Sequence, residues 1–459
     1  MANAFSPAPS AFSSTSANPM LLSDEEFEKY RYKIDPPADT AAFAILNFFE
    51  HDQVYRILGG LQKNTDKVSF DDLNKLSYTP QKDDPKAKEF IIKYMKDKID
   101  GYFNDRTHFQ FTVDEEECLQ KAAIFFNIHM TECTLALAVR SLLKQYAAFK
   151  STNVLTYTQL LPKYPYRRII STMQFVMDVM DVKAFKPEGY GIVAIQKLRL
   201  VHALIRNRID RNTIEKKEGR IWNMEWGAPI NQQDMIFAVH TFSLEVLHGL
   251  IASGEKVTNE ELQNYYRAWH LIGKALGVLD ELNPSDYYIG YQVQNRIYKK
   301  EFVNPNPNGP ELAEPLINFL VEVLPMAKRK GVYGLVKLFN DKKDYDPIFK
   351  DILHLDLSEA SKFYTSLYNA QDNFRHFLIR AKYFFLPKAK RSDYFKDVAK
   401  NEHKFFESII GVAKTWTNSH FRIADAFGTQ AAIENEKEAQ KMPMWKRAIK
   451  YFFPKADIA

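Results

Sequence analysis

Apolar residues recur with helical spacing along most of this chain, and this feature restricts its fold more than any other. Residues 114–149, 167–180, 195–209 and 258–277 each carry apolar side chains three and four positions apart. Runs with the alternation typical of β-strands are rare, and only 17 of the 459 residues are glycine. We therefore expect an all-α fold: a single large helical domain over residues 21–459, with additional peripheral helices around its core.

The composition excludes several classes of protein. The 62 basic and 57 acidic side chains leave a net charge of +5, which is too balanced to indicate a nucleic-acid partner. The two cysteines, Cys118 and Cys133, are too few for a disulfide framework, and the lack of a CxxCH motif excludes covalent haem attachment. The 34 Phe and 24 Tyr residues indicate a wide apolar interior with room for a flat hydrophobic ligand.

The two ends of the chain differ in character. Residues 1–20 are rich in Ser, Pro and small side chains and lack the features of a signal peptide, so we expect a disordered tail and a cytoplasmic protein. No run of eighteen apolar residues occurs, so no transmembrane helix is expected. Residues 383–391 and 442–455 mix aromatic with basic side chains. They could form a peripheral membrane contact, or else a terminal helix that packs on the core and keeps its lysines solvated.

The stretch K-L-R-L-V-H-A-L-I-R at residues 197–206 carries the most informative constellation. Arg199, His202 and Arg206 share one face of an otherwise apolar helix. A histidine in such a setting is costly to charge and would keep a free lone pair, while two buried arginines require anions. A porphyrin supplies both needs, with an iron for the imidazole and two propionates for the guanidiniums. The alternative is a hydrogen-bonded histidine of the core with no ligand role.

A second pair, Arg168 and Thr172, lies one helical turn apart on the apolar segment 167–180. We interpret it as one wall of a dioxygen pocket, in which Arg168 stabilises negative charge and Thr172 donates a hydrogen bond. The alternative is an exposed arginine at the start of a helix.

Three other histidines offer rival metal ligands. His240 and His248 are eight residues apart, two helical turns, so we interpret both as structural. Glu245-x-x-His248 fits one ligand pair of a di-iron carboxylate bundle, and Asp351-x-x-His354 is the nearest second pair. A di-iron enzyme is therefore kept as an alternative.

Four strings in fixed order resemble the family of the MpaB oxygenase and the rubber oxygenases, which include the latex clearing proteins. They are K-L-R-L-V-H-A-L-I-R, W-G-A-P-I-N-Q-Q-D, T-F-S-L-E-V-L and Y-Y-R-A-W-H-L-I-G-K-A-L-G-V. The resemblance covers about residues 120–285. It implies a globin-like helical core that holds b-type haem, with His202 as the axial ligand of the iron and with Arg168 and Thr172 in the dioxygen pocket.

Two departures from the family's pattern bear on the reaction. Latex clearing proteins have a lysine three residues after the pocket arginine, where this chain has Ser171, which would line the cofactor pocket instead. They also use a glutamate suggested to act as a base, whereas no Asp or Glu occurs here between Glu132 and Asp178. Cleavage of a polyisoprene polymer by that mechanism is therefore not expected.

The resemblance implies a haem-dependent oxygenase. It would use dioxygen on a small apolar, unsaturated substrate such as an isoprenoid or a fatty-acyl chain, by oxidative cleavage of a carbon–carbon double bond. A non-catalytic haem-binding or lipid-binding helical protein is the alternative with the same pocket. The substrate, the oligomeric state and the coordination number of the iron are not fixed by the sequence.

Overall fold

The structure is a computed structural model that describes residues 22–48, 85–158, 165–187, 189–216, 221–324 and 328–363, with a few more between 365 and 403. Within these residues the chain is helical, and the single β-type contact is an isolated bridge between Ala148 and Phe302. The predicted all-α fold class is confirmed. The 1–20 tail and residues 383–391 and 442–455 lie outside the described residues.

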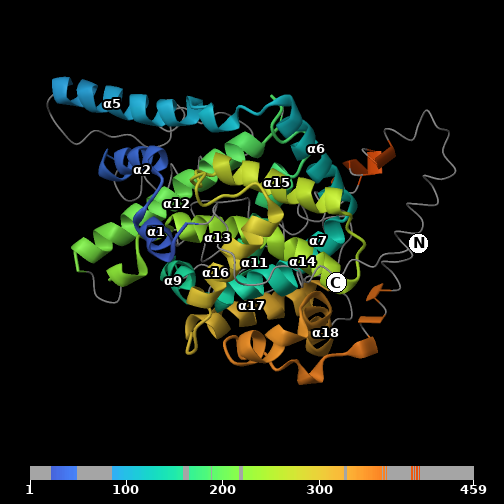
Figure 1. The fold of residues 1–459 in the computed structure, drawn as a ribbon. Helices are drawn as coiled ribbons and strands as arrows, with labels where there is room; N and C mark the ends of the chain where they lie inside the picture. The colour runs from blue at the N-terminus through green and yellow to red at the C-terminus, as the bar shows by residue number, and fades with distance from the viewer. Residues whose placement is uncertain are drawn as a thin grey trace, which may run out of the picture.

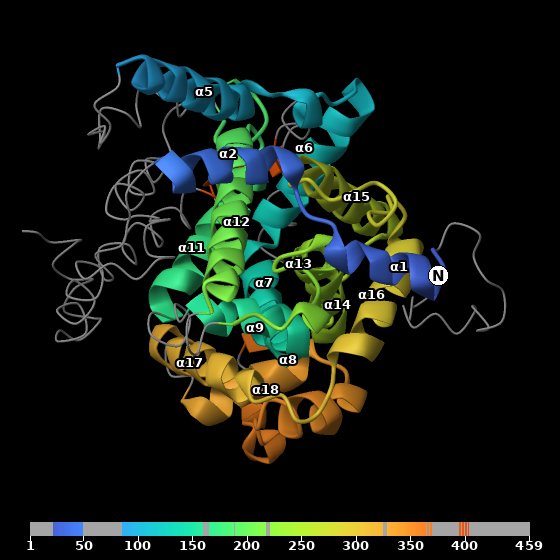
Figure 2. The same ribbon diagram turned by 90° about the vertical axis from the view of Figure 1, so that its left-hand side faces the viewer.

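The longer helices follow one another in this order: α2 (Pro36–Phe48), α5 (Pro85–Asn104), α6 (Val113–Ile128), α9 (Phe149–Thr158), α11 (Pro165–Val179), α12 (Gly191–Ile214), α13 (Gln232–Phe242), α14 (Leu244–Ser253), α15 (Asn259–Ala275), α16 (Tyr287–Glu301), α17 (Asn308–Val323) and α18 (Arg329–Phe339). Shorter helical pieces include α1 (Asp24–Lys29), η1 (Tyr30–Tyr32), α7 (Met130–Ala136), the π-helical turn η3 (Leu137–Ser141) and α8 (Leu142–Ala147). Figures 1 and 2 place α13 and α14 in the middle of the molecule, with α5 along one edge and α17 and α18 at the opposite edge.

The central helices are apolar because they are covered on all sides. The stretch Gln232–Ser253 is long and apolar enough to cross a membrane by composition, but 72% of its most apolar window is buried inside the protein. Helix α14 packs against α7 and α18, α13 against α15, and α15 against α6. One cluster of buried side chains joins these helices, and this explains the hydrophobicity of the stretch without a membrane.

Two segments with continuous helical periodicity are broken in the structure. The 114–149 segment bends by 87° at His129, where α6 ends and α7 begins, and then passes through the π-helical turn η3. The apolar stretch 237–251 is interrupted at Ser243, whose ψ of −79° departs from the helical value. No glycine or proline marks either break, and for this reason the periodicity of the sequence did not reveal them.

Helix starts follow residue types that cap helices. Asn231 caps α13, with its side chain accepting hydrogen bonds from the main-chain N–H groups of Gln233 and Asp234. Thr258 opens α15 in a capping box with Glu261.

Residues 22–39, which we call the N-terminal strap, cross the middle of the molecule. Near its beginning, Asp24 and Glu28 form ion pairs with Arg296 and Lys300 of α16. The buried guanidinium of Arg31 pairs with the buried carboxylate of Glu301. The main-chain oxygens of Phe27, Arg31 and Lys33 accept hydrogen bonds from Gln233, Ala228 and Gln232, at 2.6, 2.8 and 3.1 Å. The strap then enters α2, which packs on α12 (Figure 2).

Candidate functional site

His202 lies in the middle of α12 and lines an interior cavity between that helix, the N-terminal strap and α13. The cavity has a volume of about 10 Å³, room for about one water molecule. Its remaining walls come from residues far apart in the sequence, namely Asp35, Arg199, Arg206, Ile230, Gln232, Met235, Leu276 and Gly277.

The imidazole of His202 has no hydrogen-bond partner in the described part of the chain. Its Nδ1 atom is fully enclosed and unpaired, which is unusual for a buried polar atom. Burial and, to a smaller extent, the positive charges of Arg168 and Arg206 together lower the pKa of His202 to about 3. The ring is therefore neutral near pH 7, and a nitrogen lone pair is available to a metal.

The two neighbouring arginines already have anions. Arg199 binds Asp35 of the strap through two hydrogen bonds of 2.8 Å, from Nε and Nη2. Arg206 Nε donates to Asp39 Oδ1 at 2.9 Å. The argument that buried arginines here need haem propionates is therefore wrong, because the chain itself supplies the carboxylates. A role for Arg199 and Arg206 in cofactor binding stays a prediction.

The two ion pairs differ in how partner charge and burial affect the pKa values. Burial acts to lower the pKa of Arg199, but the hydrogen-bonded carboxylate of Asp35 outweighs it, and the pKa is raised. For Asp39, loss of solvent raises the pKa more than Arg206 lowers it. The Asp39 pair is thus the weaker of the two, with one hydrogen bond between the charged groups where Asp35 has two.

Arg168, Ser171 and Thr172 lie on α11, which packs against α12. The Arg168 side chain is exposed among the described residues, near the start of α11, as the alternative reading of the sequence expected. The helices packed around it still lower the pKa of its guanidinium. The charge of Arg168 reaches His202, so the structure brings these two predicted residues into one electrostatic environment.

Thr172 differs from its predicted role. Its hydroxyl donates a 3.0 Å hydrogen bond to the main-chain oxygen of Arg168, one turn earlier in α11. This bond occupies the hydroxyl proton, so the expectation that Thr172 donates to dioxygen is not met in this arrangement, although its oxygen can still accept. Ser171, on the same helix, is partly buried.

The structure adds Tyr146, which the sequence reasoning missed. Tyr146 lies on α8, is 4% exposed, and its hydroxyl is influenced by the positive charge of Arg168. Burial raises the pKa of this phenol, so it stays protonated near pH 7 and can donate a hydrogen bond. Nothing in the spacing of the sequence connects Tyr146 with Arg168, because they lie on separate helices.

The rival histidines are structural, as predicted. His240 Nδ1 lies 3.0 Å from Gln294 Oε1, and His248 Nε2 lies 2.6 Å from the Tyr287 hydroxyl. Glu245 is held by Arg140 at 2.7 Å and Lys144 at 3.3 Å. These two cations keep the pKa of Glu245 well below its usual value against the opposing effect of burial.

The di-iron alternative loses its support among the described residues. They contain no group of three or more His, Cys, Asp or Glu side chains placed to hold a metal ion. The carboxylate that the motif would have offered is neutralised by the chain's own cations.

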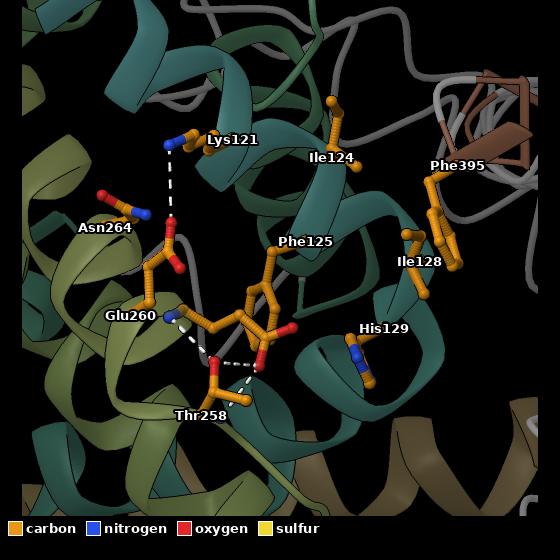
Figure 3. A pocket seen from close by; sticks show the side chains of 10 residues that line it. Lys121, Ile124, Phe125, Ile128, His129, Thr258, Glu260, Asn264 and Phe395 are labelled. Atoms are coloured by element: carbon orange, nitrogen blue, oxygen red, sulfur yellow. Dashed lines mark hydrogen bonds and ion pairs between the residues drawn. The ribbon is translucent and has the colours of Figure 1, made fainter. Parts of the chain in front are cut away.

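A second cavity, of about 450 Å³, lies between α6 and α15 and shares no lining residue with the first (Figure 3). Ile124, Phe125, Ile128 and Phe395 form its apolar part. Its charged side chains are engaged with each other or with a helix cap: Lys121 contacts Glu260 at 3.4 Å, and Glu261 caps α15 through Thr258. None of the site residues predicted from the sequence lines it.

Whether a haem fits beside His202 depends on the donor groups that the chain offers and on the size of the cavity. The unpaired, neutral imidazole of His202 fits the axial ligand of a haem iron. The cavity on the side of Asp35 and Gln232 is far smaller than a porphyrin and does not hold one. The imidazole itself, which is only partly buried, fits the role of an axial ligand.

The middle of the chain is similar to known proteins. Residues 128–338 match the family described as ER-bound oxygenase mpaB/B'/Rubber oxygenase, catalytic domain. The rubber oxygenase of Streptomyces sp. (strain K30) is 26% identical over 159 residues, which are 34% of this chain. The match spans 37% of that protein's own length.

The fold comparison extends further than the sequence match. A solved structure of a latex clearing protein in the closed state resembles this fold with a TM-score of 0.50 and 18% identity, covering 81% of this chain and 91% of that one. His202, Arg168 and Tyr146 all lie within the matched residues 128–338. Over residues 128–338 the chain is thus similar to the family of the MpaB oxygenase and the rubber oxygenases, and its helical fold is similar to that of a latex clearing protein.

Proposed function

We propose that the protein is a haem-dependent oxygenase that uses His202 as the axial ligand of a b-type haem. The observation that carries the proposal is a partly buried, neutral imidazole whose enclosed Nδ1 has no partner among the described residues, located within the catalytic-domain match. A core histidine without a ligand role normally satisfies its ring nitrogens by hydrogen bonds, as His240 and His248 do here.

The side chains around His202 support an oxygenase more than a passive haem carrier. When bound, haem would supply the iron at which dioxygen is activated. Arg168 would contribute a positive charge near the imidazole, on which that charge already acts. The protonated Tyr146 hydroxyl, close enough to sense that charge, is a second possible hydrogen-bond donor.

The substrate proposed is a small apolar molecule with a carbon–carbon double bond, such as an isoprenoid or a fatty-acyl chain. The residues between Glu132 and Asp178 include no carboxylate, and the two carboxylates at the cavity are bound to arginines. A carboxylate acting as base at this site is therefore not part of the proposal. Oxidative cleavage would be tested as dioxygen uptake with squalene or oleate, with the saturated analogues squalane and stearate as controls.

The direct test of the cofactor is an absorption spectrum of the purified protein, before and after haem is added. We expect a Soret band in the wild type that is lost or shifted in His202→Ala, and that is restored when imidazole is supplied to His202→Gly. His240→Gln is the matched control, because it changes another buried histidine while leaving an amide able to bond Gln294. Circular dichroism checks that each variant is folded.

Three results would count against all or part of the proposal. A wild type without a Soret band after haem addition would exclude haem binding. Equal spectra for the wild type and His202→Ala would show that another residue holds the iron. A normal Soret band without dioxygen uptake on any unsaturated probe would leave a haem-binding protein and remove the oxygenase.

A further inference from the structure

The cavity between α6 and α15 has the size and the lining of a site for a small molecule. Its volume of about 450 Å³ lies in the range of ligand pockets in proteins. Ile124 and Ile128 lie one turn apart on α6, and Phe395 lines the same space from the C-terminal part of the chain (Figure 3). All three side chains are half-buried, so they keep hydrophobic surface that a ligand can cover.

The floor of this cavity is fixed by contacts with the core. The Phe125 ring is 5% exposed and packs against the rings of His129 and Tyr265, with centroids 4.8 and 5.5 Å away. The Tyr265 hydroxyl donates a 3.1 Å hydrogen bond to the main-chain oxygen of Phe242, at the end of α13. A ligand would therefore enter an existing space and would not have to displace packed side chains.

The wall that Phe395 supplies is held in place by a histidine farther along the chain. His403 Nδ1 lies 2.9 Å from Asn127 Oδ1 of α6, and its Nε2 lies 3.3 Å from Asp181 Oδ2. The Asn127 amide also donates to the main-chain oxygen of Met180 at 2.7 Å. Helix α6 thus bears both the apolar isoleucines of the cavity and the contact that anchors the segment of Phe395.

The charges at the cavity disfavour an anionic ligand. Lys121 lies between two carboxylates, 3.1 Å from Glu117 and 3.4 Å from Glu260. Glu260 and Glu261 both line the cavity, so its lining has two carboxylates and one lysine that is already paired. The imidazole of His129 also lies 3.7 Å from a carboxylate. A fatty or isoprenoid acid would be repelled at this site without gaining an unpaired cation.

The lining also offers one polar group that is not in use. The main-chain oxygen of Asn264 accepts from Cys118 Sγ at 3.4 Å, but its side-chain amide has no hydrogen-bond partner among the described residues. An amide carries both a donor and an acceptor, and Glu260, one turn earlier on α15, adds a second acceptor. A hydroxyl group can donate and accept at the same time, whereas an ester or a ketone can only accept.

We propose that this cavity binds an uncharged alcohol with a hydrocarbon chain, such as a linear isoprenoid alcohol. The chain would cover Ile124, Ile128 and Phe395, and the hydroxyl would bond the amide of Asn264 beside the carboxylate of Glu260. The cavity shares no lining residue with the one at His202, so the inference does not depend on the proposed haem function. It gives the protein a second place at which an apolar molecule is held.

The test is calorimetric titration of the full-length protein with farnesol and with farnesoic acid, which have the same chain and differ in the head group. Both are used below the concentration at which they form micelles. We expect saturable binding of farnesol and about tenfold weaker binding of the acid, because the carboxylates at the cavity repel it. Glu260→Gln should raise the affinity for the acid severalfold and leave that for farnesol nearly unchanged, since it removes one of the repelling charges.

Ile124→Trp fills the cavity and should weaken farnesol binding about tenfold or more. The matched control is Ile214→Trp, which makes the same change at an isoleucine of α12 that is 80% exposed and does not line the cavity. Its affinity for farnesol should equal that of the wild type. Circular dichroism checks that each variant is folded.

Several outcomes would overturn the proposal. They are the absence of saturable farnesol binding in the folded wild type, equal binding by the wild type and Ile124→Trp, and binding of the acid as tight as that of the alcohol. If Ile124→Trp does not fold, Asn264→Leu provides the test, with an expected loss of about fivefold for farnesol from the missing hydrogen bonds. An unchanged affinity in that variant would contradict the assignment. His202→Ala should bind farnesol like the wild type, so failure of the haem function and failure of this site are distinguishable.

Discussion

At the scale of single residues, burial decides the charge of His202. Loss of solvent is the main cause of its low pKa, and two nearby guanidiniums act in the same direction. Because the pKa in the folded state, about 3, lies below the ordinary value of 6.5, the unfolded chain binds more protons between these values. Stability from this residue is fully present above pH 6.5 and is lost as the pH falls towards 3.

The lowered pKa of His202 leads to a prediction for the haem-free protein. Between pH 7 and pH 5 the free energy of unfolding of the wild type should fall by about 2 kcal/mol more than that of His202→Leu, which has no proton to take up. Urea denaturation of both proteins at the two pH values measures the difference. Parallel loss of stability in the two proteins would show that His202 titrates normally in the fold.

A second prediction concerns the buried carboxylate Glu245, which neutralises Arg140 and Lys144, all three being 5% exposed or less. Glu245→Gln leaves two buried cations without it and should cost about 3–5 kcal/mol of unfolding free energy. The control is Glu314→Gln, which breaks an exposed pair with Arg329 and should cost about 1 kcal/mol or less. Similar losses of unfolding free energy in the two variants would show that burial does not make the Glu245 ion pairs more important for stability than an exposed pair.

The sequence allowed only part of this site to be predicted. The neutral state of His202 follows from its apolar neighbours within one helix, which are visible in the sequence. The partners of Arg199 and Arg206 do not, because Asp35 and Asp39 lie 164 and 167 residues away. The hydrogen bond that the Thr172 hydroxyl donates could not be predicted either, since it depends on which of several acceptors the folded helix presents.

At the scale of elements, the cap of α13 fixes where the central helix begins. The Asn231 amide accepts from two main-chain N–H groups and donates to the Ala228 oxygen at 2.9 Å, and the residue is 1% exposed. Asn231→Ala removes all three bonds in the interior and should cost about 2 kcal/mol.

Thr258→Ala is the comparison for this cap. Thr258 makes a capping box at the exposed start of α15, and its loss should cost about 1 kcal/mol, because water can replace its hydrogen bonds. Chemical denaturation of the two variants measures the difference. A smaller loss for Asn231→Ala than for Thr258→Ala would show that the buried cap is not the stronger one.

Helix starts were predictable and helix breaks were not, for a physical reason. A cap depends on residue types a few positions apart, as in Asn231 with Asp234. The bend at His129 and the break at Ser243 instead let α7 and α14 pack closely, with Gly249 of α14 facing Ala136 of α7. A methyl group at Gly249 would lie 2.7 Å from the Ala136 Cβ, so the close approach depends on the partner helix, which the local sequence does not reveal.

At the scale of the whole molecule, the strap ties together helices that are distant in sequence. It pairs with α16 at one end and with α12 at the other, and its main chain bonds residues of α13 and the turn before it. A ligand that binds only the folded protein raises its stability by an amount set by its concentration relative to the dissociation constant. Haem at a hundredfold excess over that constant should thus add about 2.7 kcal/mol to the unfolding free energy.

Thermal or urea unfolding with and without haem measures this gain. His202→Ala should gain nothing at the same haem concentration, because the iron has lost its ligand. An equal gain in the wild type and His202→Ala would indicate adsorption of haem to apolar surface instead of binding at the site. The predicted extent of the domain, residues 21–459, stays a prediction, since parts of that range lie outside the described residues.

The strap has a consequence for how the protein can be divided. A fragment cut to the family match, residues 128–338, would retain His202, Arg168 and Tyr146 but would lose both aspartates and the whole of α2. Two bare guanidiniums and the apolar flank of α12 would then face water, and the fragment would be prone to aggregate. The smallest autonomous unit of this protein therefore extends well upstream of residues 128–338, and expression trials should begin no later than residue 22.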